Sequence, residues 1–236
     1  MAVARRAVGT VAQATSGNVS PGIPAGNTAN DILVCIVLNG LNDVLTFSGS
    51  WAKKVEVNNS TLHRLTVAWL RAVGGDAAPT ISGASVDIIA RIVSYSGCIT
   101  SGDPFDVAGT PQTDALTATV TCPAITPGTA NDMILMIGGQ STTGAEAPTF
   151  STYSGSNPAP SEAIDNAFQG AVVNVAIFAA DGTKNDTTTT GNRTAASDST
   201  LPSTGVLVSL LPAAASAFIK MVGSNFRLAG NGGLAA

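Results

Sequence analysis

Apolar and polar residues alternate with a period of two along most of this chain. In the segment "RLTVAWLR" (64–71), Leu65, Val67 and Trp69 share one face. In "ALTATVTC" (115–122), apolar residues from Leu116 to Cys122 are separated by threonines. This period is typical of β-strands with one buried face. We therefore expect the Leu116 face of this strand to point inward and its threonines to point outward.

Clusters of Gly, Pro, Asn and Asp separate these runs at fairly even spacing, among them "SPGIPAGN", "NGLND", "SGDP" and "TPGTAND". Many short strands joined by such turns predict an antiparallel all-β sandwich or barrel. A helical candidate is "SEAIDNAF" (161–168), where a capping-like serine predicts one or two helical turns. The polar stretch from Asp181 to Thr200 is expected to form an exposed loop or an extended hairpin.

The tetrapeptide Thr-Ala-Asn-Asp occurs twice, at 28–31 and 129–132, each time after a turn and before an apolar run. The order of strands and turns that follows is also the same. This repetition predicts two related sets of strands, at 15–100 and 115–213. Asn and Asp after a turn brace their own backbone, and so each tetrapeptide indicates a structural joint at the entry to a strand.

We expect the two sets to form one large β-sandwich over residues 15–213. The preceding residues, 1–14, are expected to form an N-terminal strand or arm. The Gly-rich and nearly uncharged residues 214–236 are expected to form an extended C-terminal arm that lies across a neighbouring subunit.

The composition narrows the classes of function. The chain has 236 residues, which a single β-sandwich can reach, and 44% of them are hydrophobic. Only 11% are charged and the net charge is -4, which argues against nucleic acid as a partner because such proteins carry a basic surface. The N-terminus lacks a secretory apolar segment and no run is long enough for a membrane span. We expect synthesis in the cytosol without membrane insertion.

Three cysteines, Cys35, Cys98 and Cys122, are too few and odd in number for a disulfide scaffold. Cys35 and Cys122 fall on apolar strand faces and are expected to be small core residues. A bond between Cys98 and Cys122 stays open.

Four aspartates are candidates for binding Ca²⁺, an ion that prefers oxygen ligands. They are Asp31 and Asp132 in the two joints, and Asp103 and Asp106 in "SGDPFD". None has the spacing of a known calcium loop. The main expectation is therefore that the joints are turn braces, with no metal and no cofactor, and Ca²⁺ is the alternative.

The chemistry-bearing residues do not form a catalytic motif. His63 is the only histidine, and no GxSxG segment provides a serine nucleophile beside it. We expect His63 on a surface or interface strand. Phosphate-binding, dinucleotide-binding and HExxH motifs do not occur, and scattered carboxylates leave a glycoside hydrolase only as an alternative. The sequence predicts a protein that is not an enzyme.

Aromatic residues beside turns suggest a different class, a carbohydrate-binding module. Trp51 follows "SGS" and Tyr153 precedes "SGSN", which places both near loops. Such residues either stack on a sugar ring or pack as a lid on the end of a sandwich. Trp51 and Tyr153 are therefore the candidate ligand-binding residues.

The segments "RLTVAWLRAVGGDAAPTIS", "IIARIVSYSG" and "DPFD", together with the joint and the "SGSW" turn, resemble phage virion proteins and related phage-derived bacterial proteins. The resemblance covers about residues 25–145 and fades beyond Thr183. It implies a jelly-roll-like β-sandwich that serves in capsid decoration, a tail or a fibre. It carries over no catalytic residue.

The expected function is thus a non-enzymatic structural protein of a bacteriophage virion, assembled in the host cytoplasm. Its expected partners are copies of itself and other virion proteins. The alternative is a carbohydrate-binding module for host attachment, with a surface glycan as its ligand.

Overall fold

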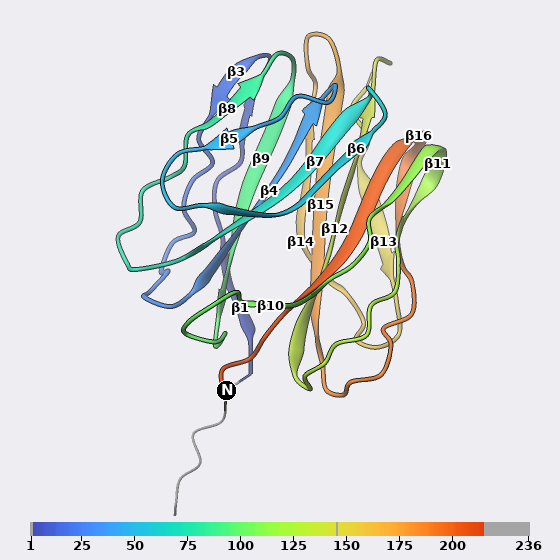
Figure 1. Ribbon diagram of the computed structural model, residues 1–236. Helices are drawn as coiled ribbons and strands as arrows, with labels where there is room; N and C mark the ends of the chain where they lie inside the picture. The colour runs from blue at the N-terminus through green and yellow to red at the C-terminus, as the bar shows by residue number, and fades with distance from the viewer. Residues whose placement is uncertain (1, 145, 215–236) are drawn as a thin grey trace, which may run out of the picture.

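The computed structural model describes residues 2–144 and 146–214, and these form an antiparallel β-sandwich (Figure 1). The predicted all-β fold class is confirmed. The predicted helical turns at 161–168 are wrong, because this segment is the strand β14 (Ser161–Phe168) and pairs with β15 (Asn174–Lys184). Its Ile164 is buried against the core, so pairing with β15 and packing on the core prevail over the capping-like serine.

The first sheet is built from the N-terminal part of the chain. In spatial order it consists of β1 (Ala4–Val8), β9 (Ile88–Ser96), β4 (Ile32–Gly40), β7 (His63–Arg71) and β6 (Ala52–Asn59), and β2 (Ala12–Ala14) also pairs with β9. A small outer sheet of β3 (Gly17–Val19), β8 (Ile81–Ala84) and β5 (Thr46–Phe47) lies beside it. The segment expected to be an N-terminal strand or arm therefore contributes two strands, β1 and β2, to the first sheet.

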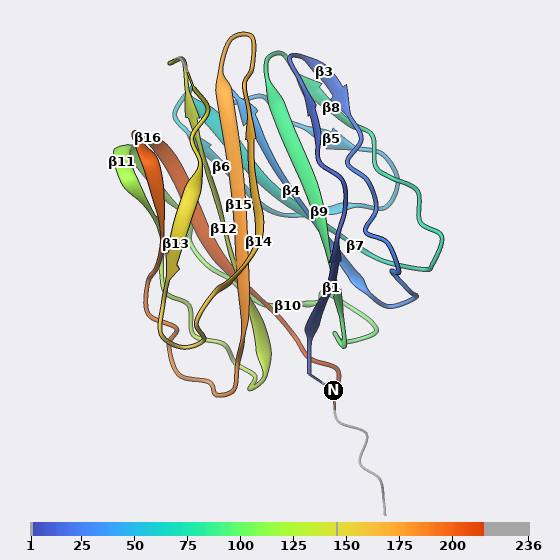
Figure 2. The ribbon, with the colours of Figure 1, turned by 180° about the vertical axis from the view of Figure 1, so that it is seen from behind.

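The second sheet is built from the C-terminal part. In spatial order it consists of β10 (Phe105–Ala108), β16 (Arg193–Leu210), β12 (Asp132–Thr142), β15 and β14. Two further strands, β11 (Gln112–Cys122) and β13 (Phe150–Ser154), also pair with β16 (Figure 2). The polar stretch that begins at Asp181 covers the end of β15, a loop at 185–192 whose first five residues are exposed, and the start of β16. Within the described residues β15 and β16 each pair with β12 and not with each other, so the stretch contains an exposed loop and not the extended hairpin that was the other expectation.

The two sheets have the same connectivity. Each central strand, β4 or β12, follows a Thr-Ala-Asn-Asp joint and lies between two long strands of its own half. The outer strands match as well. In the first half β8 lies between β3 and β5, and in the second half the first part of β16 lies between β11 and β13. Each half thus keeps to its own sheet. The connectivity supports a duplication but does not confirm the jelly-roll detail of the prediction.

The main core lies between the two sheets and is shared by both halves. Ile32, Val34, Ile36 and Leu38 of β4 contribute to the same buried cluster as Met133, Leu135 and Ile137 of β12. The alternate residues of β4 face away from this core into a second apolar cluster, and those of β12 face into a third. These two clusters lie under the outer strands. Both faces of the central strands are buried, which accounts for their continuous apolar sequences.

Both ends of the described chain lie at the same end of the sandwich. Val3 is buried near the end of β9, and the amide of Ala213 donates to the carbonyl of Gly97 at 2.7 Å. The expected arm at 214–236 lies outside the described residues, apart from Ala214. All three cysteines are buried and free. Within the described residues, no helix has the length and apolar character to cross a membrane.

Candidate functional site

The first joint brings the chain into β4 through a left-handed turn. Asn30 has φ of 72°, and its amide donates to the carbonyl of Ala72 at 2.8 Å. Asparagine tolerates this conformation better than most residues. Asp31 follows, and its carboxylate accepts a hydrogen bond from the amide of Thr28 at 2.8 Å. The predicted brace is therefore present at the first joint.

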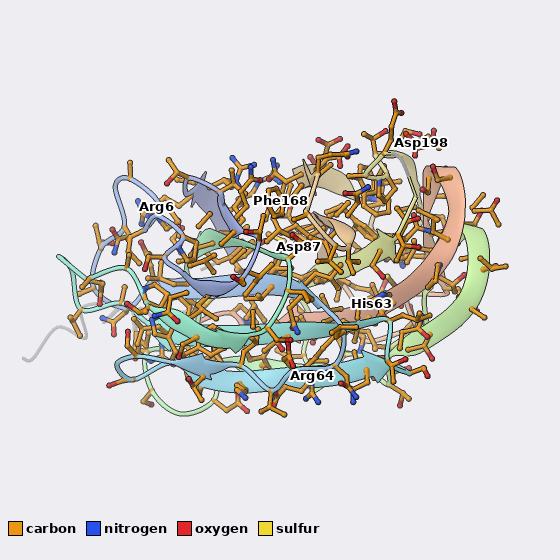
Figure 3. All side chains as sticks on the ribbon, turned by 90° about the horizontal axis from the view of Figure 1, so that it is seen from above. Arg6, His63, Arg64, Asp87, Phe168 and Asp198 are labelled. Carbon is orange, nitrogen blue, oxygen red and sulfur yellow. The ribbon has the colours of Figure 1, made fainter. Side chains whose placement is uncertain are left out.

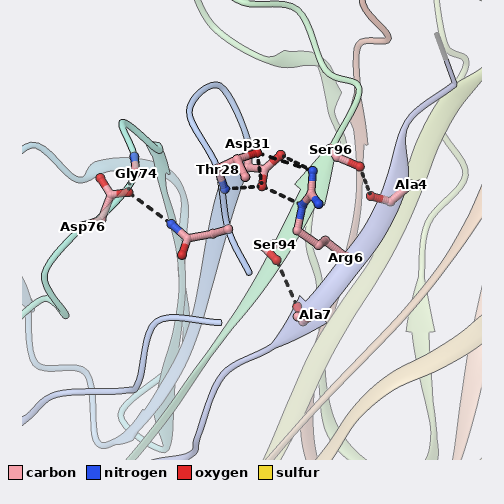
Figure 4. Close-up of polar contacts among 10 residues, drawn as sticks. Ala4, Arg6, Ala7, Thr28, Asp31, Gly74, Asp76, Ser94 and Ser96 are labelled. Carbon is pink, nitrogen blue, oxygen red and sulfur yellow. Dashed lines mark hydrogen bonds and ion pairs between the residues drawn. The ribbon is translucent and has the colours of Figure 1, made fainter. Parts of the chain in front are cut away.

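Arg6 of β1 neutralises the buried carboxylate of Asp31. Its Nε lies 2.7 Å from Asp31 Oδ2, and one terminal nitrogen is 3.2 Å from Oδ1 (Figure 4). Arg6 is the extra residue of a β-bulge between Arg5 and Ala7. A bulge redirects the side chain of its extra residue, and here the side chain reaches the joint. Asp31 is already occupied by protein partners and is not free to bind a cation.

The second joint has the same backbone. Asn131 has φ of 68°, and its amide donates to the carbonyl of Lys184 at 2.7 Å. Asp132 follows as the first residue of β12 and is fully buried. Unlike Asp31, it has no hydrogen bond of normal geometry to either carboxylate oxygen. The two joints thus share their backbone and differ in their electrostatics.

Asp106 explains this difference, because it occupies in β10 the place that Arg6 has in β1. Asp106 is the extra residue of a bulge between Phe105 and Val107. Its Oδ2 accepts the amide of Thr129 at 3.0 Å, a role that Asp31 itself fills at the first joint. A carboxylate therefore replaces the guanidinium, and Asp132 loses both the cation and the amide donor.

The pKa of Asp132 reflects this environment. Burial and the neighbouring Asp106 carboxylate raise it to about 7, whereas the nearby Ser209 hydroxyl lowers it. Removing a carboxylate from water disfavours its charged form, and a second negative charge adds to that cost. Asp132 and Asp106 are the two predicted ligand residues that the fold brings together.

Asp103 stands apart from this pair. Its carboxylate lies 2.6 Å from Lys54 Nζ and also accepts the amide of Phe105 at 3.0 Å. Within the described residues, no group of three or more His, Cys, Asp or Glu side chains gathers in a way that could hold a metal ion. A cation site would therefore have to use the Asp106–Asp132 pair with hydroxyl, carbonyl or water oxygens.

The two aromatic candidates have different surroundings. Trp51 is partly exposed, stacks on Phe47 at 6.4 Å between ring centroids, and lines a shallow cleft with Arg71 and Asp76. Tyr153 packs against Phe178 at 5.8 Å, and its hydroxyl oxygen is buried. The structure thus presents Trp51 at a cleft and places Tyr153 against the outer core of the second sheet.

His63 lies in the interior and not on the surface, contrary to the sequence-based expectation. Figure 3 labels its side chain. Its Nδ1 is 2.7 Å from Ser141 Oγ, and its Nε2 is 2.8 Å from Thr204 Oγ1. Burial lowers its pKa to about 4. The ring joins β7 of one sheet to β12 and β16 of the other. The sequence missed this role because the two hydroxyl partners come from distant parts of the chain.

An apolar patch lies at the end of the sandwich opposite the described chain ends. We define it by the exposed side chains of Leu41, Leu62 and Leu116, which line a small groove together with Val173 and Leu201. Leu116 is 69% exposed. The alternation pattern predicted it to point inward, but irregular pairing between Asp114 and Thr119 shifts the register of β11.

Comparison with known proteins gives no relative. No protein-family profile, no curated protein and no solved structure matches this chain. The functional argument therefore rests on the residues and their geometry.

Proposed function

We propose that this protein is a non-enzymatic structural protein of a bacteriophage virion, which assembles with copies of itself and with neighbouring virion proteins. The observation that carries the proposal is the apolar patch. Contiguous exposed apolar surface of this kind marks protein interaction sites. The phage setting comes from the resemblance of residues 25–145 to virion proteins.

Two further observations support a structural role. The only histidine is buried with both ring nitrogens engaged by hydroxyl groups, so it is not presented to a substrate. The charged fraction of 11% is low, which leaves much of the surface neutral and suited to close packing between subunits. The patch is formed by several loops and strand ends, and so its shape depends on the whole sandwich.

The test measures oligomeric state by size-exclusion chromatography with light scattering. The protein is expected to form an oligomer, and the double change Leu62→Ser and Leu116→Ser is expected to convert it to a monomer. Val73→Ser is the matched control, because Val73 is 77% exposed but lies outside the patch. A monomeric wild-type protein at high concentration, or an oligomer unaffected by the double change, would contradict the proposal.

A second candidate function is binding of a host-surface glycan at the Trp51 cleft. A partly exposed aromatic ring beside a guanidinium and a carboxylate is a suitable platform for a sugar. In this structure, however, Asp76 already accepts hydrogen bonds from the amides of Val73 and Gly74. Glycan-array binding that disappears in Trp51→Ala, while oligomerisation persists, would favour this second function.

A further inference from the structure

The bulge residue beside each joint carries a different charge. It is the positively charged Arg6 at the first joint and the negatively charged Asp106 at the second, a difference of two units of charge. At the first joint the Arg6 guanidinium lies 2.7 Å from the Asp31 carboxylate. At the second joint the bulge residue is Asp106, and the buried Asp132 carboxylate has no hydrogen bond of normal geometry. Among the described charged groups, no Lys or Arg forms an ion pair with either Asp106 or Asp132.

A buried carboxylate without a partner is costly to a fold. Native proteins compensate such a group with a counter-charge, a proton or a metal ion. The two joints have the same backbone. The position that the Arg6 guanidinium fills at the first joint therefore has an equivalent at the second joint, next to Asp132. A positive ion in that place would restore at the second joint the charge balance of the first.

We propose that the second joint binds a divalent cation of the Ca²⁺ class between Asp132 and Asp106. The inference is independent of the proposed virion function, because it rests on the asymmetry of the two joints alone.

The donor atoms at this position are all oxygens. Neither oxygen of Asp132 has a hydrogen bond of normal geometry, although the Ser209 hydroxyl and the Asp106 carboxyl group lie next to it. Asp106 Oδ2 accepts the amides of Gly128 and Thr129, which leaves Oδ1 toward the pair. The Ser209 hydroxyl lies beside Asp132 and accepts the amide of Val107 at 3.1 Å. Hard oxygen donors favour Ca²⁺ over softer metals. With only two carboxylates, a dissociation constant of about 0.1–1 mM is expected, as in weak extracellular calcium sites.

The competing occupant is a proton shared between the two carboxyl groups. Such a pair titrates as a unit and holds one proton between two like charges. It would stabilise the protein on acidification and would not respond to calcium. Measurements at pH 8 favour the ionised pair and so separate the two occupants.

The experiment follows full-length protein, first freed of metal with EDTA, during titration with CaCl₂ at pH 8. Isothermal titration calorimetry gives the affinity and a thermal melt gives the change in stability. The wild-type protein is expected to bind one Ca²⁺ and to melt at a higher temperature, because a ligand that binds only the folded state stabilises it. Asp106→Asn and Asp132→Asn are each expected to weaken binding by at least about tenfold.

Two matched variants sharpen the test. Asp103→Asn is the control, because Asp103 lies on the same connection but is paired with Lys54, and it is expected to bind Ca²⁺ as the wild type does. Asp106→Arg recreates the pairing of the first joint and is expected to raise the melting temperature without metal and to abolish the calcium response.

Three results would overturn the proposal. The first is that the wild-type protein binds no calcium at 10 mM, about tenfold above the weakest expected dissociation constant. The second is that binding survives both Asp106→Asn and Asp132→Asn. The third is that acid alone, and not calcium, stabilises the protein. The last result would assign a shared proton to the pair.

Discussion

At the scale of single residues, the positions of Arg6 and Asp106 decide the electrostatics of the two joints. The repeated tetrapeptide is visible in the sequence, and its backbone role is as expected, with Asn30 and Asn131 both left-handed. The partner of each aspartate could not be predicted, because it comes from a bulge in a strand far away in the chain. A bulge interrupts the period-two alternation of a strand, so the sequence pattern does not show which side chain the bulge redirects.

His63 makes a prediction about stability and pH. Burial lowers its pKa to about 4 from the ordinary 6.5, so the unfolded chain binds more protons than the folded protein between these values. The free energy of unfolding should therefore fall as pH decreases from 6.5 to 4, by up to about 3 kcal/mol. Urea unfolding at a series of pH values measures this loss.

A comparison with His63→Gln isolates the contribution of the imidazole. Asp132 and Asp165 have pKa values raised by burial to about 7 and about 6, and their effect on stability has the opposite sign in this range. The difference between wild type and variant cancels those contributions. If that difference does not change between pH 6.5 and 4, the imidazole is not neutral and buried in solution as described.

At the scale of elements, the alternation pattern predicted strands well where pairing is regular. It failed in β11, where register shifts between Asp114 and Thr119 expose Leu116. The pairing of β14 with β15, and not its local sequence, makes residues 161–168 a strand. In both places the outcome depends on a neighbouring strand, and a single sequence does not reveal which strand that is. The apolar patch was missed for the same reason.

Asp87 links the turns of the two sheets and provides an element-scale prediction. Its carboxylate, in the turn between β8 and β9, accepts the amides of Ala171, Val172 and Val173 at 2.6–2.8 Å. Burial alone would raise the pKa of Asp87, but these hydrogen bonds outweigh it and the pKa is lowered. Asp87→Ala should cost about 2–4 kcal/mol, because it leaves the buried amide of Val173 and the two part-buried amides without an acceptor.

Asp198 serves as the control for Asp87. It also accepts an amide hydrogen bond, from Thr149 at 3.1 Å, but it lies at the exposed surface within one half (Figure 3). Asp198→Ala should cost no more than about 1 kcal/mol in urea unfolding, as is usual for a neutral or exposed hydrogen bond. Equal losses for the two variants would argue against a special role for the Asp87 turn.

At the scale of the whole molecule, two similar halves share one core. The cluster that contains Val34 and Ile36 of β4 also contains Leu135 and Ile137 of β12. Neither sheet can cover that face by itself, and a sheet needs a second layer to bury its apolar side. We therefore expect residues 1–103 and 104–236, produced separately, to remain unfolded, and the mixed fragments to fold together.

Circular dichroism and thermal melting of each fragment, measured at low concentration to avoid self-association, test this expectation. A cooperative melt of either fragment as a monomer would show that one half is an independent domain. Reconstitution in the mixture would show that the interface between the sheets is sufficient to hold them without the covalent connection.

The two ends of the described residues meet at Gly97, and this has a consequence for the order of the halves. The carbonyl of Gly97 accepts the amide of Ala213, and Ala2 also lies against this glycine. A short linker could therefore join Ala213 to Ala2, and new ends could be opened in the exposed turn at Ser101 and Gly102. Such a circular permutant of residues 2–213 would reverse the order of the two halves while keeping every described strand pairing intact, since permutation is tolerated where the joined ends are close.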